Sequence, residues 1–170
     1  MLDLKQNGNN KVNQKGTTMK VRSVTKNKGK PIITLSPADT LDQAVSLMMN
    51  HRIGSILIVD PDKLVGILSE RDLLRVLHQG LDQSLVDITV KAAMTPNPIT
   101  CDPDDSLEDA MTLMVDNNIR HLPVLYNGKL EGMLSITDIV EKLLEKAKFE
   151  NKLLKNYIQN WPEDETEEAR

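Results

Sequence analysis

Residues 34–72 of the amino-acid sequence recur in the same register at 100–138, and this internal repeat constrains the possible folds more than any other feature. The two copies align without a gap over about forty positions, far longer than chance would maintain. Identical pairs include Thr34 and Thr100, Pro37 and Pro103, Leu41 and Leu107, Gly66 and Gly132, Ser69 and Ser135, and Asp72 and Asp138. A repeat of this length indicates one supersecondary unit used twice, each copy covering an apolar face of the other. A chain of 170 residues has room for two such half-sized units.

Each copy contains the same order of local signals. A turn with capping side chains, at 36–40 and 102–106, precedes an amphipathic helix whose apolar residues follow i, i+3, i+4, i+7 spacing. These residues are Leu41, Ala44, Val45 and Met48 in the first copy and Leu107, Ala110, Met111 and Met114 in the second. Short apolar runs around turn residues then predict a strand hairpin, followed by a second helix. We therefore predict an α+β (mixed α/β) fold of tandem repeats, each a short β-sheet packed with two helices.

The repeat also suggests a division of the chain into five parts. Residues 1–20 form a basic arm, 21–84 and 85–145 form the two units, 146–160 extend the last helix, and 161–170 form an acidic tail. The apolar pattern of the last helix continues to about Asn160, so that helix should be about 25 residues and about 37 Å long. This exceeds what one small unit can cover, and we expect its far half to pack on a partner.

Composition excludes several classes of protein. A single cysteine, Cys101, rules out intramolecular disulfides and multi-cysteine zinc sites and fits a reducing compartment. No apolar run is long enough to span a bilayer, and the start of the chain does not look like a secretory signal. We therefore expect a cytoplasmic protein without a membrane association. Only four aromatic residues are present, which argues against base stacking on single-stranded nucleic acid.

The most informative local pattern is Gly, two residues, Ser, two residues, Asp, which occurs at 66–72 and again at 132–138. Asp72 and Asp138, in the first turn of a predicted helix, could each accept hydrogen bonds from two ribose hydroxyls. Ser69 and Ser135, beside the amides of the helix start, could donate to phosphate. The alternative is that these side chains only cap helices, which stabilises a helix by about 1 kcal/mol per cap.

With this repeat and its duplicated motif, the segment from about Val21 to Leu144 resembles the CBS domain family, named after cystathionine β-synthase. The resemblance implies a Bateman module: two units related by a pseudo-two-fold axis, with clefts that bind AMP, ADP, ATP or NAD through its adenosine half. It further implies that such a module regulates another protein by changing conformation or assembly.

The resemblance also implies further nucleotide-binding residues. The segment 120–124, Arg-His-Leu-Pro-Val, is similar to the basic pair before Leu-Pro with which related proteins meet phosphate. The first unit has Gly54 and Ser55 at the positions of this pair, so the two sites should be chemically unequal. The remaining implied contacts are Arg71 beside Asp72, Thr137 at the matching place, Thr34 and Thr100 on the strands that enter each unit, and Pro123. The full set is Thr34, Ser69, Arg71, Asp72, Thr100, Arg120, His121, Pro123, Ser135, Thr137 and Asp138.

Nothing in the sequence indicates catalysis. His51, His78 and His121 lie in separate segments without metal-ligand spacing, and no phosphate-binding loop of the Walker type or dinucleotide glycine motif occurs. Cys101 is best interpreted as a small buried apolar residue. We therefore expect neither an enzyme nor a metal site.

Two other functions remain open at this point. The module could have lost its ligand and serve as a dimerisation scaffold, or it could regulate nucleic acid through the basic arm, although nucleic acid is not the favoured partner. Whichever function applies, we expect a homodimer through the repeat helices. The resemblance implies that the first helices of the units form the face where two modules meet, and adaptable methionines such as Met48, Met49, Met111 and Met114, although more often core residues, suit such an interface.

Overall fold

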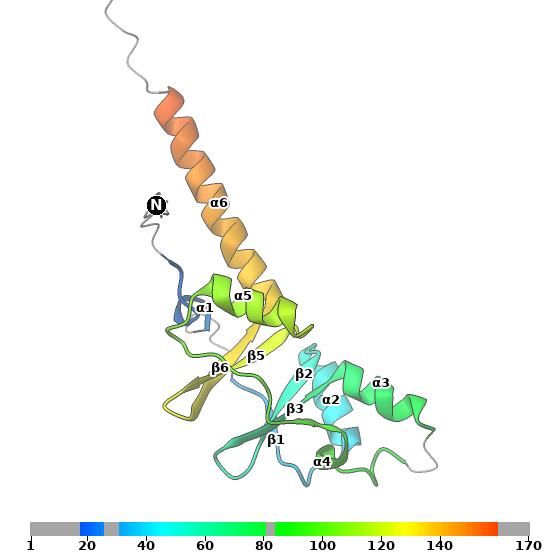
Figure 1. The fold of residues 1–170 in the computed structure, drawn as a ribbon. Helices are drawn as coiled ribbons and strands as arrows, with labels where there is room; N and C mark the ends of the chain where they lie inside the picture. The colour runs from blue at the N-terminus through cyan, green and yellow to red at the C-terminus, as the bar shows by residue number, and fades with distance from the viewer. Residues whose placement is uncertain (1–17, 26–30, 81–83, 160–170) are drawn as a thin grey trace, which may run out of the picture.

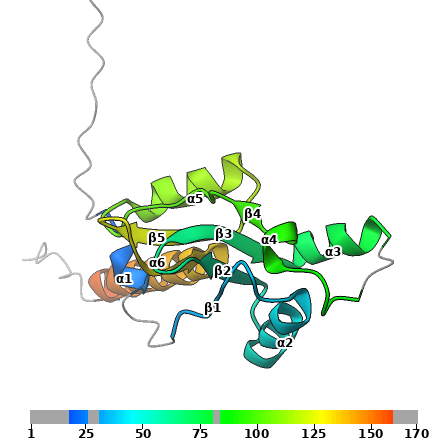
Figure 2. The same cartoon turned by 90° about the horizontal axis from the view of Figure 1, so that it is seen from below.

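The computed structural model describes residues 18–25, 31–80 and 84–159, and within them it shows two α+β units side by side (Figures 1 and 2). The first contains β1 (Thr34–Leu35), α2 (Leu41–His51), β2 (Ser55–Val59), β3 (Leu64–Ser69) and α3 (Glu70–His78). The second contains α5 (Leu107–Asp116), β5 (His121–Tyr126), β6 (Lys129–Ser135) and α6 (Ile136–Gln159). Short elements precede each unit: α1 (Arg22–Thr25), α4 (Val90–Ala93) and β4 (Thr95–Pro96). The mixed α/β class expected from the repeat is confirmed.

The two hairpins have the same register at equivalent positions of the repeat. Ser55 lies opposite Ser69 in the antiparallel pair β2–β3, and His121 lies opposite Ser135 in β5–β6. The ladder is interrupted after Ile58 in the first hairpin and after its repeat equivalent, Val124, in the second. In the first unit β1 and β4 flank the hairpin to give the order β1-β2-β3-β4. In the second, Cys101 bridges to Val124 in the parallel sense. The duplication is therefore preserved in backbone detail.

Capping explains where the first helix of each unit begins. Thr40 caps α2, because its hydroxyl accepts the Gln43 amide at 3.3 Å while the Gln43 side chain accepts the Thr40 amide at 2.9 Å. Ser106 caps α5 by accepting the Asp109 amide at 2.9 Å. These side chains satisfy amides that have no partner within the helix.

Two hydrophobic clusters form the core, and each includes a segment that lies outside its own repeat. Val21, from before the first repeat, is buried with the second. Ile88 and Val90, from before the second repeat, are buried with the first. Main-chain hydrogen bonds show the same exchange. The Val21 amide donates to the main-chain carbonyl of Asp105 at 3.0 Å, and the Val90 amide donates to that of Asp39, the repeat equivalent of Asp105, at 2.7 Å. The packing therefore crosses the predicted boundary between residues 21–84 and 85–145.

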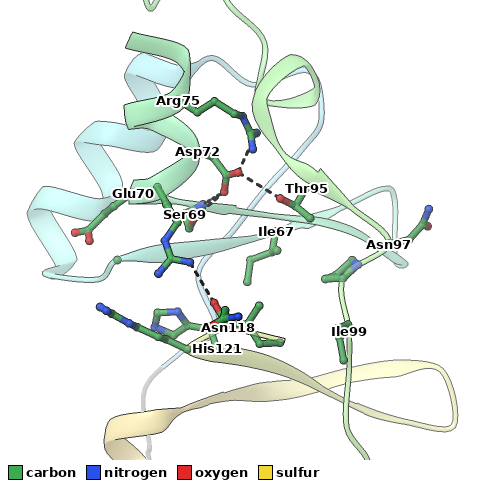
Figure 3. Close-up of a pocket in the computed structure, with 15 residues that line it drawn as sticks. Ile67, Ser69, Glu70, Asp72, Arg75, Thr95, Asn97, Ile99, Asn118 and His121 are labelled. Carbon is green, nitrogen blue, oxygen red and sulfur yellow. Dashed lines mark hydrogen bonds and ion pairs between the residues drawn. The ribbon is translucent and has the colours of Figure 1, made fainter. Parts of the chain in front are cut away.

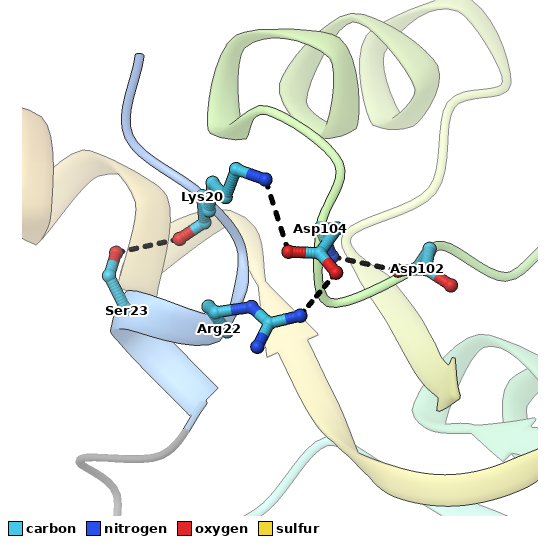
Figure 4. Close-up of polar contacts among 5 residues, drawn as sticks. All are labelled: Lys20, Arg22, Ser23, Asp102 and Asp104. Carbon is cyan, nitrogen blue, oxygen red and sulfur yellow. Dashed lines mark hydrogen bonds and ion pairs between the residues drawn. The ribbon is translucent and has the colours of Figure 1, made fainter. Parts of the chain in front are cut away.

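Ion pairs hold the segment around Val21 against the turn that precedes α5 (Figure 4). Lys20 lies 3.1 Å from the Asp104 carboxylate, and Arg22 pairs with the other oxygen of the same group. These cations lower the pKa of the Asp104 carboxyl, the Lys20 contact being the largest cause. Residues 1–17 of the predicted basic arm and residues 160–170, which include the acidic tail, lie outside the described residues.

The last helix, α6, has 24 residues, as the long apolar pattern predicted. Its first half packs on the second unit through Ile139, which is fully buried, and Leu143. Its second half extends away from both units, with every residue from 147 to 159 exposed (Figure 1). Among the described residues, no helix combines the length and apolarity needed to cross a bilayer.

Candidate functional site

A pocket of about 580 Å³ lies between the two units, and segments from both contribute to its wall (Figure 3). The first unit supplies Gly54 and Ile67 together with residues 69–72 and Arg75 around the start of α3. The connection between the units supplies Thr95 and residues 97–99, and the second unit supplies residues 118–121. A ligand in this pocket would therefore touch both repeats at once.

Asp72 is the only buried charged side chain in the described part of the chain, and it lines this pocket at 5% exposure. One carboxylate oxygen accepts both the Ser69 amide, at 2.8 Å, and the Ser69 hydroxyl, at 2.6 Å. The other lies 3.0 Å from Arg75 and accepts the Thr95 hydroxyl at 3.3 Å. Asp72 therefore both caps the start of α3, by accepting from Ser69, and lines the pocket.

Arg71 connects the two sides of the pocket. Its guanidinium donates to the main-chain carbonyl of Asn118 at 3.1 Å, which links α3 to the turn after α5 (Figure 3). Asn118 has a positive φ of 52°, which directs the chain sharply out of α5 toward β5. The side chain of Arg71 is exposed, so it can exchange this carbonyl for another acceptor with little structural change.

The pocket also contains apolar surfaces, formed by Ile67, Ile99, Pro98 and Ile119. Ile67 projects from β3, and Ile99 comes from the connection between the units (Figure 3). Ile99 is 39% exposed, although aliphatic side chains are usually covered. Apolar walls with a few convergent polar groups are typical of small-molecule sites.

The basic pair Arg120 and His121 faces the first motif across the pocket. Both residues line the same pocket as Ser69 and Asp72, although they are about fifty positions away in the sequence. The repeat equivalent of Arg120 is Gly54, where an added Cβ would lie 3.2 Å from the Glu70 carboxylate. A side chain at position 54 would therefore crowd the pocket wall, whereas Arg120 adds a cation to it.

Five of the residues predicted from the sequence meet in this pocket: Ser69, Arg71, Asp72, Arg120 and His121. The others do not line it. Thr34 is exposed on β1, Pro123 is buried in β5, and Thr100 is partly buried just before the bridge at Cys101.

The second motif, with Ser135, Thr137 and Asp138, is also outside this pocket but repeats the local geometry of the first. The Ser135 amide donates to Asp138 at 2.7 Å, and the Ser135 hydroxyl donates to the same oxygen. Residues 26–30, which correspond in the sequence repeat to 92–96, lie outside the described residues. The role of this motif in binding therefore stays a prediction.

The sequence analysis missed several polar residues of the pocket, namely Glu70, Arg75, Thr95, Asn97 and Asn118. Arg75 had a detectable signal, because a cation three residues after an aspartate on a helix can pair with it. The asparagines could have been noted as residues that tolerate positive φ, and Asn97 and Asn118 do adopt φ of 48° and 52°. Thr95 had no local signal, since only the packing of β4 on β3 brings it to Asp72.

Cys101 is not part of the pocket. It is 6% exposed, and burial, with smaller contributions from Asp105 and Asp102, raises the pKa of its thiol to about 12. Such a thiol is a poor nucleophile at neutral pH. Within the described ranges, no group of three or more His, Cys, Asp or Glu is gathered as a metal site.

Comparison with known proteins identifies the class. The CBS domain family model matches residues 21–79 and 90–145, and the chain belongs to this family as a CBS domain pair, a regulatory module. A similar relative is the mitochondrial CBS domain-containing protein CBSX3 of Arabidopsis thaliana, 33% identical over 82% of this chain and 71% of that protein.

Solved structures agree with this assignment. A putative signal-transduction protein with CBS domains from Burkholderia ambifaria superposes with a TM-score of 0.69 at 36% identity, covering 75% of this chain and 95% of that chain. CBSX2 in complex with AMP gives a TM-score of 0.64 at 26% identity, covering 74% and 97%. The CBS domain pair of MJ0100, in complex with 5′-methylthioadenosine and S-adenosyl-L-methionine, gives 0.67 at 27% identity, covering 76% and 98%.

Proposed function

We propose that this chain binds an adenosine nucleotide in the pocket between its repeats and transmits the bound state to a partner protein. The observation that carries the proposal is that one pocket joins the Ser69–Asp72 motif of the first repeat to Arg120 and His121 of the second. The structures of CBSX2 with AMP and of MJ0100 with methylthioadenosine and S-adenosylmethionine support an adenosine ligand.

Asp72 is the group suited to the ribose. An ionised carboxylate has about four acceptor sites, and a vicinal diol can donate two hydrogen bonds to it. Four donors occupy these sites in the structure, so the diol would replace the Ser69 and Thr95 hydroxyls, which can rotate away, while the Ser69 amide and Arg75 hold the carboxylate in place. The acceptor is therefore oriented before the ligand arrives, which reduces the ordering cost of binding.

The cations suit the phosphate. Arg71, Arg75 and Arg120 line the pocket together with His121, against the two acids Glu70 and Asp72. Hydrogen bonds from guanidinium to phosphate contribute about 1.5 to 3 kcal/mol each, so one or two of them would distinguish a nucleotide from its nucleoside. Arg71 is the most available donor, because its present acceptor is a main-chain carbonyl at an exposed turn.

The base would occupy the apolar part of the pocket between Ile67 and Ile99. Their flat aliphatic surfaces can cover both faces of a purine without charge.

Regulation follows from the position of the pocket between two units. A ligand that binds one relative arrangement of the units more tightly shifts the population toward it by its differential affinity. The Arg71–Asn118 hydrogen bond crosses the same gap, so a phosphate that captures Arg71 would release this link. The chain would then report ligand occupancy as a change in the angle between the repeats.

Isothermal titration calorimetry tests this function directly. AMP, ADP, ATP and NAD are titrated into the full chain, with GMP as the matched purine control. Saturable binding of at least one adenosine ligand, weaker for GMP, is expected. A complete lack of heat and of thermal shift with millimolar adenosine ligands would favour the ligand-free scaffold instead.

A further inference from the structure

Helix α6 presents an exposed stripe, apolar apart from one asparagine, that runs along most of its length and that the nucleotide site does not use. The stripe consists of Val140, Leu144, Ala147, Asn151, Leu154 and Ile158, which follow one another at alternating intervals of four and three residues. Leu154 and Ile158 are 63% and 71% exposed. The alternating interval averages about 3.5 residues and is the spacing of the contact positions in a two-stranded coiled coil.

The stripe is distinct from the face that packs on the second unit. Ile136, Ile139 and Leu143 belong to the core cluster, whereas Val140 and Leu144, each next to a core residue in the sequence, are both 52% exposed. The stripe therefore begins at Val140 and Leu144, beside the body of the protein, and continues along the second half of α6, which extends away from both units (Figure 1).

A competing ridge on the same helix fits a partner less well. Phe149, Leu153 and Tyr157 are also exposed, but they are separated by four residues at each step. Because each residue of an α-helix turns by about 100°, such a ridge rotates by about 40° per step. The alternating stripe drifts by only about 20° per heptad, so a supercoiled partner can follow it.

We propose that this stripe pairs with the same stripe of a second copy of the chain, in parallel and in register. Asn151, in the middle of the stripe, selects this arrangement. In a parallel pair the two Asn151 amides face each other and can hydrogen-bond, whereas an antiparallel pair places each amide against an apolar side chain. A buried asparagine at such a position specifies register and two strands at some cost in stability.

The flanking charges favour the same geometry. With Leu144 and Ile158 in the same heptad position as Asn151, Glu150 lies immediately before that position and Lys155 lies five residues after Glu150. In a parallel coiled coil these two flanking positions of opposite chains lie side by side, so each Glu150 would meet Lys155 of the second copy. The pair would thus form two symmetric ion pairs around the asparagine layer.

Disulfide trapping in the full chain tests this pairing. Leu144→Cys is introduced together with Cys101→Ala, so that residue 144 carries the single thiol, and the dilute protein is oxidised. Rapid formation of a dimer linked at position 144 is expected, because equivalent positions of a parallel pair are adjacent. Little or no crosslinking at position 144 would overturn the proposal.

Two matched variants and one mixture make the result specific. Adding Leu154→Glu, on the stripe, should slow crosslinking at least tenfold, while Leu153→Glu, its exposed neighbour on the competing ridge, should leave it nearly unchanged. Equal effects of the two substitutions, or a larger effect of Leu153→Glu, would refute pairing through the stripe. In a mixture of Leu144→Cys and Leu154→Cys chains, preferential crosslinking between the two kinds of chain would show an antiparallel pair, with Asn151 opposite Ala147, and would overturn the proposal.

Discussion

The guanidinium of Arg75 lies 3.0 Å from the carboxylate of Asp72, one helical turn earlier on α3. Arg75 also donates to the main-chain carbonyl of Ala93 at 2.8 Å, so it joins α3 to the segment that precedes the second repeat. The carboxylate at the centre of the pocket is therefore compensated within its own unit. Because Arg75 already neutralises Asp72, Arg71 and Arg120 remain for the phosphate of the proposed ligand.

The first prediction concerns this carboxylate. Asp72→Asn should weaken binding of the adenosine ligand at least tenfold, because an amide nitrogen replaces one acceptor and the charge is lost. The control is Asp109→Asn, since Asp109 occupies the same position in α5 and accepts the Ser106 hydroxyl at 2.6 Å, but does not line the pocket. Calorimetry should show unchanged affinity for the control; equal loss in both variants would mean that only folding had been disturbed.

The second prediction separates phosphate recognition from nucleoside recognition. Arg120→Gln should reduce the affinity for AMP by about tenfold or more, equivalent to about 1.4 kcal/mol, while the affinity for adenosine changes little. Lys129→Gln, which removes an exposed cation at the start of β6, serves as the charge-matched control. If AMP and adenosine lose affinity equally in Arg120→Gln, this arginine does not contact the phosphate.

The third prediction uses the duplicated glycines. At Gly66, an added Cβ would lie 2.5 Å from the Met94 sulfur and 3.2 Å from the main-chain oxygen of Thr95. Gly66→Ala should therefore destabilise the fold by about 1 to 3 kcal/mol and displace the Thr95 hydroxyl from the pocket. Gly132→Ala is the matched control, because its Cβ would make ordinary contacts with Thr25 at 3.5 Å. Denaturant melts of the two variants, followed by AMP titration, check both parts.

The fourth prediction follows from the raised pKa of Cys101. Because the pKa of this thiol is about 12 in the folded chain against an ordinary value of 9.0, the neutral thiol favours the folded state, fully so below pH 9. Stability should then fall as pH rises above 9, by about 1.4 kcal/mol from this group at pH 10. Cys101→Ala should show a shallower decrease between pH 8 and pH 10 in urea melts. Parallel pH profiles of the two proteins would contradict the assignment.

The elements within each repeat could be predicted because their causes are local. The hairpins, the caps at Thr40 and Ser106, and the continuous α6 all follow from periodicity and turn chemistry within a few residues. The presence of Ser69 and Asp72 in the pocket follows from the same kind of signal, since both lie at the start of one helix.

The contacts between repeats could not be predicted in this way. The basic pair at 120–121 meets the first motif because of how the two units pack, and no residue near Arg120 in the sequence encodes that choice. The same holds for Val21, which is fully buried in the second cluster although it precedes the first repeat. The apolar residues around Val21 show no hydrophobic periodicity long enough to predict which cluster it packs in.

The exchange of Val21 and Val90 between the clusters has a consequence for how this chain can be divided. A fragment that stops at residue 84 would lose Ile88, Val90 and Ala93 and expose the apolar surface they cover, although β1, α2, β2, β3 and α3 would all be present. After a proteolytic cut in the connection, the two pieces would still pack against each other. To move one repeat into another protein, the segment that packs on it from outside the repeat, around Val21 or around Val90, would have to be included.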